Sequence, residues 1–193
     1  MSQALAPVST STYEAADRAA WRAWLRDNGT TAGEVWLVLR HAGSAVPSVR
    51  HREAIEEALC VGWIDSHARK RDADSWCLRF TPRHPRSAWS NVNRALVDRL
   101  TAEGLMTPAG QAAIDLAKRT GTWALLADAQ DGVVPDDLRE ALAADPAAAA
   151  HFTAFPPSTR RAILESLARA KRPETRRRRI ARAVERAARN ERS

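Results

Sequence analysis

The stretch RFTPRHPRSAWSNVN, Arg79–Asn93, gathers residue types that bind negatively charged groups. Its three arginines carry planar guanidinium groups, which match the geometry of carboxylates and phosphates. Its two prolines fix backbone torsions and stiffen the loop, and Trp89 offers a flat apolar face. Ser90 or Asn91 can cap the helix that follows, whose first N–H groups favour an anion. The pattern predicts a rigid pocket for a small anionic or planar molecule.

A second stretch, ALCVGWIDSH (58–67), places a carboxylate near a histidine. Trp63, Asp65 and His67 alternate along a predicted strand and therefore point to the same side. Beside an arginine, Asp65 stays ionised and is structural. Without such a partner its pKa rises, and it could exchange protons with a substrate, helped by His67 or His84. A small-molecule enzyme is therefore an alternative to a binding protein, and the sequence leaves open whether a reaction is catalysed.

The predicted site combines both stretches with the C-terminal region. Lys171 and Arg176 would close it if the last helix folds back. The opposing interpretation is that the arginines pair with nearby aspartates, such as Asp65, Asp72 and Asp74, and lock the sheet to the helix. The predicted ligand-binding residues are Trp63, Asp65, Arg79, Arg83, Ser87, Trp89, Ser90, Asn93, Lys171 and Arg176, and the catalytic candidates are Asp65, His67 and His84.

The net charge of +7 is concentrated at one end of the chain. Residues 158–193 contain 13 Lys and Arg against 4 Glu, and the rest contains 17 against 19. Nucleic-acid binding through Arg172–Arg189 is therefore a further alternative. The segment contains no aromatic residue, so base stacking is not indicated. A solvated helix balanced in part by Glu174 and Glu185 is the competing interpretation.

Several classes of site and location are disfavoured by what the sequence lacks. No phosphate-binding, dinucleotide-binding or hydrolase motif occurs. The five histidines and two cysteines show no metal-ligand spacing, so we expect neither metal nor cofactor, and the cysteines are expected to be buried thiols. No apolar run is long enough to span a membrane, and the N-terminus does not resemble an export signal, which predicts a cytoplasmic protein. The oligomeric state is left open.

Periodicity predicts an α+β protein with a small antiparallel sheet of about three strands and helices, followed by an all-helical C-terminal half. We expect a disordered N-terminus (1–10), an α+β core (11–106) and a helical region (107–193) that packs on the core and ends in a basic helix. Strands are predicted in 34–43 and, as a pair, around 63–72 and 75–82. Helices are predicted from Ser11 to about 28, and over 48–63, 90–104, 107–121, 134–145, 146–155, 157–170 and 172–190.

Five motifs occur here in a familiar order: ALCVGWIDS, RFTPRHPRSAWSNVN, GLMTPAG, GTW and AKRPETRRRRI. The chain resembles the YdeI/OmpD-associated family, also labelled bacteriocin-protection, from about Trp24 to Arg182. The resemblance implies a compact bacterial domain with a role in stress or antimicrobial protection, and it defines no reaction or cofactor. Its pattern includes most residues of the predicted site and adds Thr81, Pro82, Thr175 and Arg179.

Overall fold

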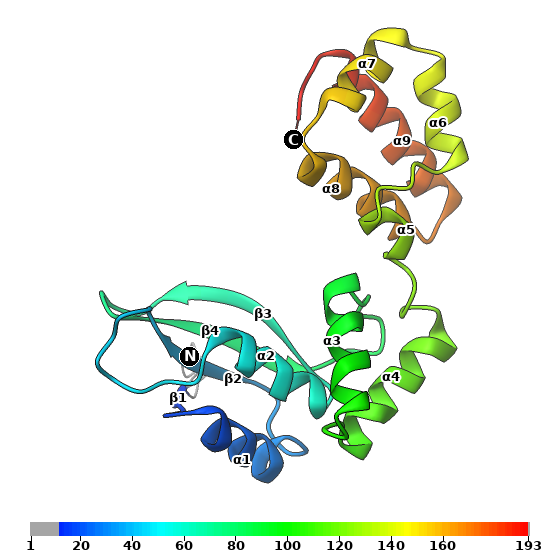
Figure 1. The fold of residues 1–193 in the computed structure, drawn as a ribbon. Coiled ribbons are helices and arrows are strands. Elements are labelled where there is room, and N and C mark those ends of the chain that lie inside the picture. Colours follow the sequence, from blue (N-terminus) through cyan, green and yellow to red (C-terminus); the bar gives the residue numbers. More distant parts are fainter. Residues whose placement is uncertain (1–11, 193) are drawn as a thin grey trace, which may run out of the picture. The chain divides into compact units, whose positions relative to one another are not determined.

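The computed structural model describes residues 12–192 and contains a four-stranded sheet with helices, followed by a helical C-terminal half (Figure 1). The strand order is β1-β2-β4-β3. The predicted antiparallel strands are β2 (Val35–Arg40), β3 (Trp63–Lys70) and β4 (Ser75–Pro82). A short fourth strand, β1 (Thr12–Glu14), pairs in parallel with β2. The predicted fold class is confirmed, with one strand more than expected.

The first helix, α1 (Arg18–Asn28), begins later than the sequence indicated. Its N-cap is Asp17, whose carboxylate accepts a hydrogen bond from the backbone N–H of Ala20 at 2.8 Å. Glu14 was expected inside the helix but lies in β1, where its carboxylate binds Arg40 and Arg71. The expected helix start at Ser11 and the expected disorder of 1–10 fall outside the described residues.

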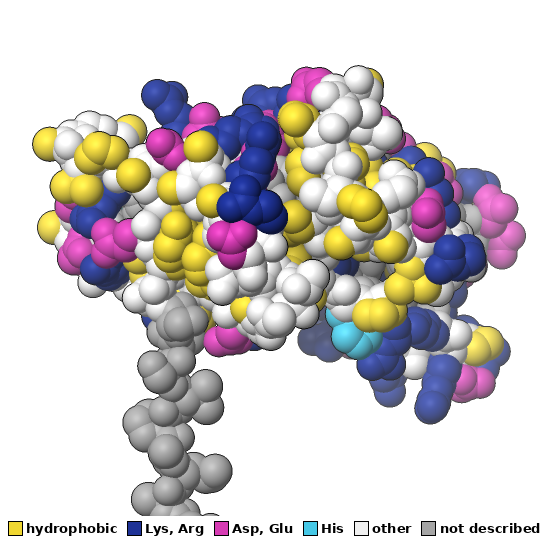
Figure 2. All heavy atoms as spheres, turned by 90° about the horizontal axis from the view of Figure 1, so that it is seen from below, with side chains coloured by type: hydrophobic (Ala, Val, Ile, Leu, Met, Phe, Trp, Pro, Cys, Tyr) yellow, Lys and Arg dark blue, Asp and Glu magenta, His cyan; other side chains and the backbone are white. Residues whose placement is uncertain are grey.

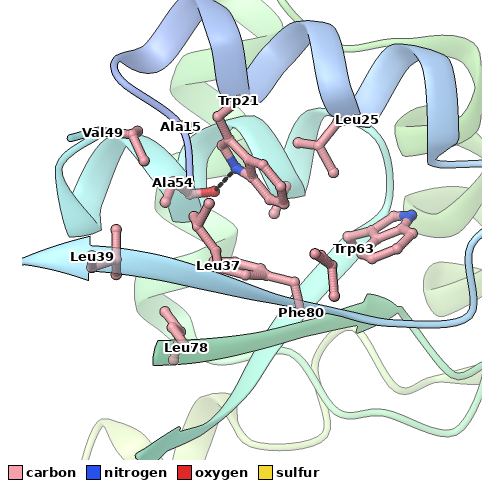
Figure 3. Close-up of a cluster of buried hydrophobic side chains, with 12 residues drawn as sticks. Ala15, Trp21, Leu25, Leu37, Leu39, Val49, Ala54, Trp63, Leu78 and Phe80 are labelled. Atoms are coloured by element: carbon pink, nitrogen blue, oxygen red, sulfur yellow. Dashed lines mark hydrogen bonds between the residues drawn. The ribbon is translucent and has the colours of Figure 1, made fainter. Parts of the chain in front are cut away.

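The first hydrophobic core lies between the sheet and the helices α1 and α2 (His51–Cys60) (Figure 3). Trp21 is fully buried there, and its indole N–H donates to the carbonyl of Ala54 at 3.1 Å. Alternate residues of β4, including Leu78 and Phe80, face the same core, as their period of two requires. Two further helices follow the sheet, α3 (Asn91–Ala102) and α4 (Pro108–Thr120).

The chain divides into two compact units. The first, called here the N-terminal unit, combines the chain up to Ser87 with Ala95–Leu116. The second, the C-terminal unit, combines Ala88–Arg94 with the residues from Ala117 onward. The expected packing of 107–193 on the 11–106 core stays a prediction.

The C-terminal unit has a hydrophobic core of its own, which includes Leu138, Phe152, Leu164 and Leu167. The short helix α5 was not predicted, and the other four lie close to their expected positions. The helices of this unit are α5 (Ala127–Gln130), α6 (Asp136–Ala143), α7 (Pro146–Ala154), α8 (Pro157–Ala168) and α9 (Pro173–Ala188).

Candidate functional site

The two tryptophans predicted to form flat ligand-binding walls are both core residues. Trp63 is 1% exposed, donates its indole N–H to the carbonyl of Gly29 at 3.0 Å, and meets Trp24 edge-on. Trp89 is also 1% exposed and packs against Trp123 with 5.0 Å between ring centroids. Neither ring presents an open face, so a stacked ligand would require repacking of the surrounding core.

Two of the predicted anion-binding arginines are held by acidic residues that sequence reasoning did not pair with them. The Nε of Arg79 donates to Oε2 of Glu34 at 2.9 Å, and a second nitrogen of the same guanidinium binds the same oxygen. Arg176 binds Asp137 through two hydrogen bonds. Both guanidinium groups therefore stabilise the fold through pairs within their own unit.

Arg83 and Asp65 are the predicted site residues that interact electrostatically. Burial lowers the pKa of Arg83 to about 10, and the nearby charge of Asp65 opposes this shift. The loop is also fixed by the backbone, because the N–H of Arg83 donates to the carbonyl of Gly62 at 2.9 Å. An arginine beside Asp65 favours the structural interpretation of this carboxylate.

The two candidate histidines are exposed. His84 accepts a hydrogen bond at Nδ1 from the backbone N–H of Arg86 at 3.1 Å. Within residues 12–192, neither His67 nor His84 hydrogen-bonds to Asp65. The acid–base pair stays a prediction.

The remaining predicted residues have local roles. Ser90 caps α3, because its hydroxyl accepts from the N–H of Asn93 at 3.1 Å, as the sequence indicated. The N–H of Ser87 donates to the carbonyl of His84 and closes a turn. Lys171 is exposed in the segment before α9. Since the chain passes from one unit to the other after Ser87, a pocket built from the whole stretch stays a prediction.

The C-terminal unit contains a groove of about 370 Å³ between α8 and α9. Its apolar floor includes the half-buried Ile163 and the buried Leu167 of α8, with Ala183 of α9. Its basic wall consists of Arg179, Arg182 and Arg186 of α9, with Arg192 beyond the helix end. The volume lies within the range of small-molecule sites.

The basic wall belongs to a continuous arginine face. At 3.6 residues per turn, five arginines of α9 fall within an arc of about 100°. The buried Ile180 and Ala187 lie on the opposite side of the helix. We call this the arginine face, and it consists of Arg178, Arg179, Arg182, Arg186 and Arg189.

The groove carries a surplus of positive charge. Arg182 makes no ion pair with any residue between 12 and 192, and its side chain is exposed. Arg186 lies 3.7 Å from Glu191, while Arg179 donates to the backbone carbonyl of Ser166, which leaves its charge uncompensated. The groove can therefore bind an anionic group at its wall and an apolar or planar body at its floor.

Sequence reasoning recognised the arginines of the last helix but missed the floor of the groove. Helical spacing shows that Ile163 lies on an apolar face, but not which helix packs beside it. It also missed Glu56 and Glu57, adjacent acids of α2 that are 4% and 2% exposed and bind arginines. Arginines at four-residue spacing in α1, at positions 18 and 22, could have indicated basic partners for buried acids.

Residues 13–113, more than half of the chain, match the family described as "Domain of unknown function (DUF8412)". The chain belongs to the DUF8412 family. In this DUF8412 protein, residues 131–190 also match the family described as "Bacteriocin-protection, YdeI or OmpD-Associated", which confirms the resemblance over that segment. The motifs before it fall largely within the DUF8412 match. Neither the curated proteins nor the solved structures provide a match.

The described part of this DUF8412 protein contains no helix long and apolar enough to cross a membrane. Across residues 12–192 no three His, Cys, Asp or Glu side chains are grouped closely enough to bind a metal ion. The groove between α8 and α9 is lined mainly by residues of the segment that matches the bacteriocin-protection family.

Proposed function

We propose that this DUF8412 protein protects a bacterial cell against an antimicrobial molecule by binding an anionic, planar or amphiphilic compound in the α8–α9 groove. The observation that carries the proposal is the pairing of a basic wall with an apolar floor inside one small groove. The description of the matched family supports a protective role. Binding would lower the free concentration of the compound, and no catalytic step is required.

The chemistry of the groove selects for both halves of such a ligand. The guanidinium of Arg182 is not neutralised by an acidic residue of the described chain, so an anion gains a charge-assisted hydrogen bond there. The floor at Ile163 and Leu167 removes apolar surface of the ligand from water, which contributes about 25 cal/mol per Å² buried. A compound with only one of the two features should bind more weakly.

Two fluorescent probes with the same ring system test this requirement. Anilinonaphthalene sulfonate is anionic and planar, and phenylnaphthylamine lacks the sulfonate. The native protein should bind the sulfonate more tightly than phenylnaphthylamine. Arg182→Ala should reduce the ratio of the two affinities about tenfold. Arg177→Ala is the matched control, because it removes the same charge from the same helix outside the groove. Equal binding by both variants would contradict the proposal.

The location of the site is tested by a change that leaves the arginines in place. Ala162 is exposed on α8 and lines the groove, so Ala162→Glu places a negative charge at the site without disturbing the core. Binding of the sulfonate probe should be lost. Ala154→Glu makes the same change at an exposed position of α7 outside the groove and should bind normally. Circular dichroism of both variants checks that the helices are retained.

Nucleic-acid binding is a second candidate function, favoured by the arginine face of α9. Arg178 belongs to this face but does not line the groove. Binding to a short DNA duplex should weaken steeply as salt rises, and Arg178→Ala should reduce it while leaving the sulfonate probe unaffected. Duplex binding that does not respond to salt would exclude this candidate.

A further inference from the structure

The N-terminal unit contains a second cavity, of about 480 Å³, that is separate from the sequence-predicted site. It lies between α1, the end of α2 and the segment that joins α3 to α4. Most of its lining surface is apolar, and Leu25, Val61, Leu105 and Ala109 contribute to it. A cavity of this size and composition is typical of a site for an apolar small molecule.

A buried carboxylate forms part of the cavity wall. Glu57 is 2% exposed and binds Arg22 through two hydrogen bonds of 2.6 Å, from Nε and Nη2. Arg18 adds a third, from Nε at 2.5 Å. Both carboxylate oxygens of Glu57 accept hydrogen bonds from arginines. Glu57 therefore anchors guanidinium groups and is not available as a base.

Glu57 fixes Arg22 in a defined orientation at the rim of the cavity. The side chain of Arg22 is 51% exposed, so its guanidinium is accessible to a ligand. A free arginine side chain loses considerable rotamer entropy when it binds, and the fork to Glu57 removes part of that loss in advance. Nη1 of Arg22 has no hydrogen-bond acceptor in the described part of the chain and can donate to an anion.

The ion-pair network to which Glu57 and Arg22 belong has a net positive charge. Glu56 binds Arg18, Arg52 and Arg99, and Arg99 also binds Glu103. With the pairs of Glu57, four arginines face three glutamates. Counted over these seven side chains, the network has one surplus positive charge, and Arg22 and Glu57 are its members that line the cavity.

The thiol of Cys60 adds no charge to the cavity. Cys60 lines the cavity and is 3% exposed. Burial, and secondarily the charge of Glu57, raises the pKa of the thiol to about 11, so Cys60 is a neutral apolar surface at physiological pH.

A second rim arginine, Arg26, is already paired with Asp27. Figure 2 views the molecule from below Figure 1 and shows Lys and Arg side chains, in dark blue, beside hydrophobic side chains in yellow.

We propose that this cavity binds a monocarboxylic acid with an aliphatic body, with the carboxylate on Arg22 and the body against Leu25, Val61 and Leu105. Glu57 is a positioning residue that acts through Arg22. The site is independent of the groove in the C-terminal unit, and the two can be tested separately.

The experiment is a calorimetric titration of the full chain with dodecanoate, below its micelle concentration, and with dodecanol. All proteins carry Ala162→Glu, the substitution expected to abolish binding in the α8–α9 groove. The background protein should bind dodecanoate about tenfold more tightly than dodecanol. Arg22→Gln keeps a hydrogen-bond donor for Glu57 but removes the charge, and should abolish this preference while leaving dodecanol binding unchanged.

A second variant separates the cavity from the rest of the surface. Ala109 is exposed at the start of α4 and lines the cavity, and Ala109→Phe should fill it and eliminate binding of both compounds. Ala112→Phe, at an exposed position of the same helix outside the cavity, is the control. Normal binding in Ala109→Phe, a preference for dodecanoate that survives Arg22→Gln, or no binding by the background protein would each overturn the proposal. None of these results bears on the groove.

Discussion

Arg176 of α9 and Asp137 of α6 form a two-bonded ion pair, with 2.5 Å from Nε to Oδ2 and 2.9 Å from Nη2 to Oδ1. The third nitrogen of this guanidinium, Nη1, donates to the carbonyl of Leu167 in α8 at 3.2 Å. One side chain therefore joins three helices of the C-terminal unit. Arg176 was predicted to close a ligand site, and these contacts favour a structural role for it.

Replacing this tie should lower the free energy of unfolding. Asp137 is 42% exposed, so solvent screens the pair, and we expect Arg176→Ala to cost about 1 kcal/mol. Urea unfolding measures the change. Arg177→Ala, next in sequence but exposed, should alter the midpoint much less. Equal midpoints for the two variants would show that the pair contributes nothing.

The same pair makes stability depend on pH. The hydrogen bonds from Arg176 hold the pKa of Asp137 below its ordinary value of 3.8. The native state therefore binds the proton less tightly than the unfolded state, and the pair's stabilisation is present above pH 3.8 and lost as the pH falls through the folded pKa. Asp137→Asn should be less stable than the native sequence at neutral pH, with the difference shrinking in acid. Urea unfolding at several pH values measures this, and a difference that is constant into acid would contradict it.

The order and type of the elements were predictable because their signals are local. Alternation identified β4, and Gly29, Gly62 and Gly104 marked the ends of three helices, although the exact boundaries differ. The helix predicted over residues 12–17 is wrong, because a Ser-x-x-Glu pattern can cap a helix but does not require one. Here Glu14 pairs across the sheet with Arg40 and Arg71, and tertiary pairing overrides the local pattern.

The ion-pair partners and the cavities were not predictable, because they depend on which elements pack together. Arg79 was expected near an aspartate and binds Glu34, which lies 45 residues earlier. Trp63 and Trp89 were predicted to form flat walls of a ligand pocket, but residue type alone does not separate a core tryptophan from a binding one. Both are buried, and their contacts come from Gly29 and Trp123.

Gly110 should tolerate no side chain. An added Cβ would lie 2.2 Å from the carbonyl oxygen of Cys60, where α4 packs closely against the end of α2. Gly110→Ala must shift backbone and should cost about 1–3 kcal/mol. Gly33→Ala is the control, because nothing lies within 4 Å of its added Cβ. Thermal unfolding of both variants gives the comparison, and an unchanged transition for Gly110→Ala would show that the contact yields easily.

The two cysteines should react only when the protein opens. Cys60 and Cys77 are free thiols and are 3% and 2% exposed. Burial raises the pKa of Cys60 to about 11, which leaves little thiolate at neutral pH. Iodoacetamide should therefore modify neither residue in the native protein and both in urea, as measured by mass spectrometry. Rapid native modification of Cys60 would mean that the cavity beside it opens frequently.

Substitution of Glu57 should lower the free energy of unfolding more than substitution of an exposed glutamate that also pairs with an arginine. Glu57→Gln keeps the shape of the side chain but leaves Arg22 without its buried counter-charge, whereas Arg18 keeps its pair with the buried Glu56. Because one partner in a largely buried network is removed, we expect a loss of about 1–3 kcal/mol in urea unfolding. Glu103→Gln removes the same charge from an exposed pair with Arg99 and should change the free energy little. If the two variants lose equal stability, the buried ion pairs of Glu57 are no stronger than the exposed pair of Glu103. The argument that Glu57 fixes the orientation of Arg22 would then fail.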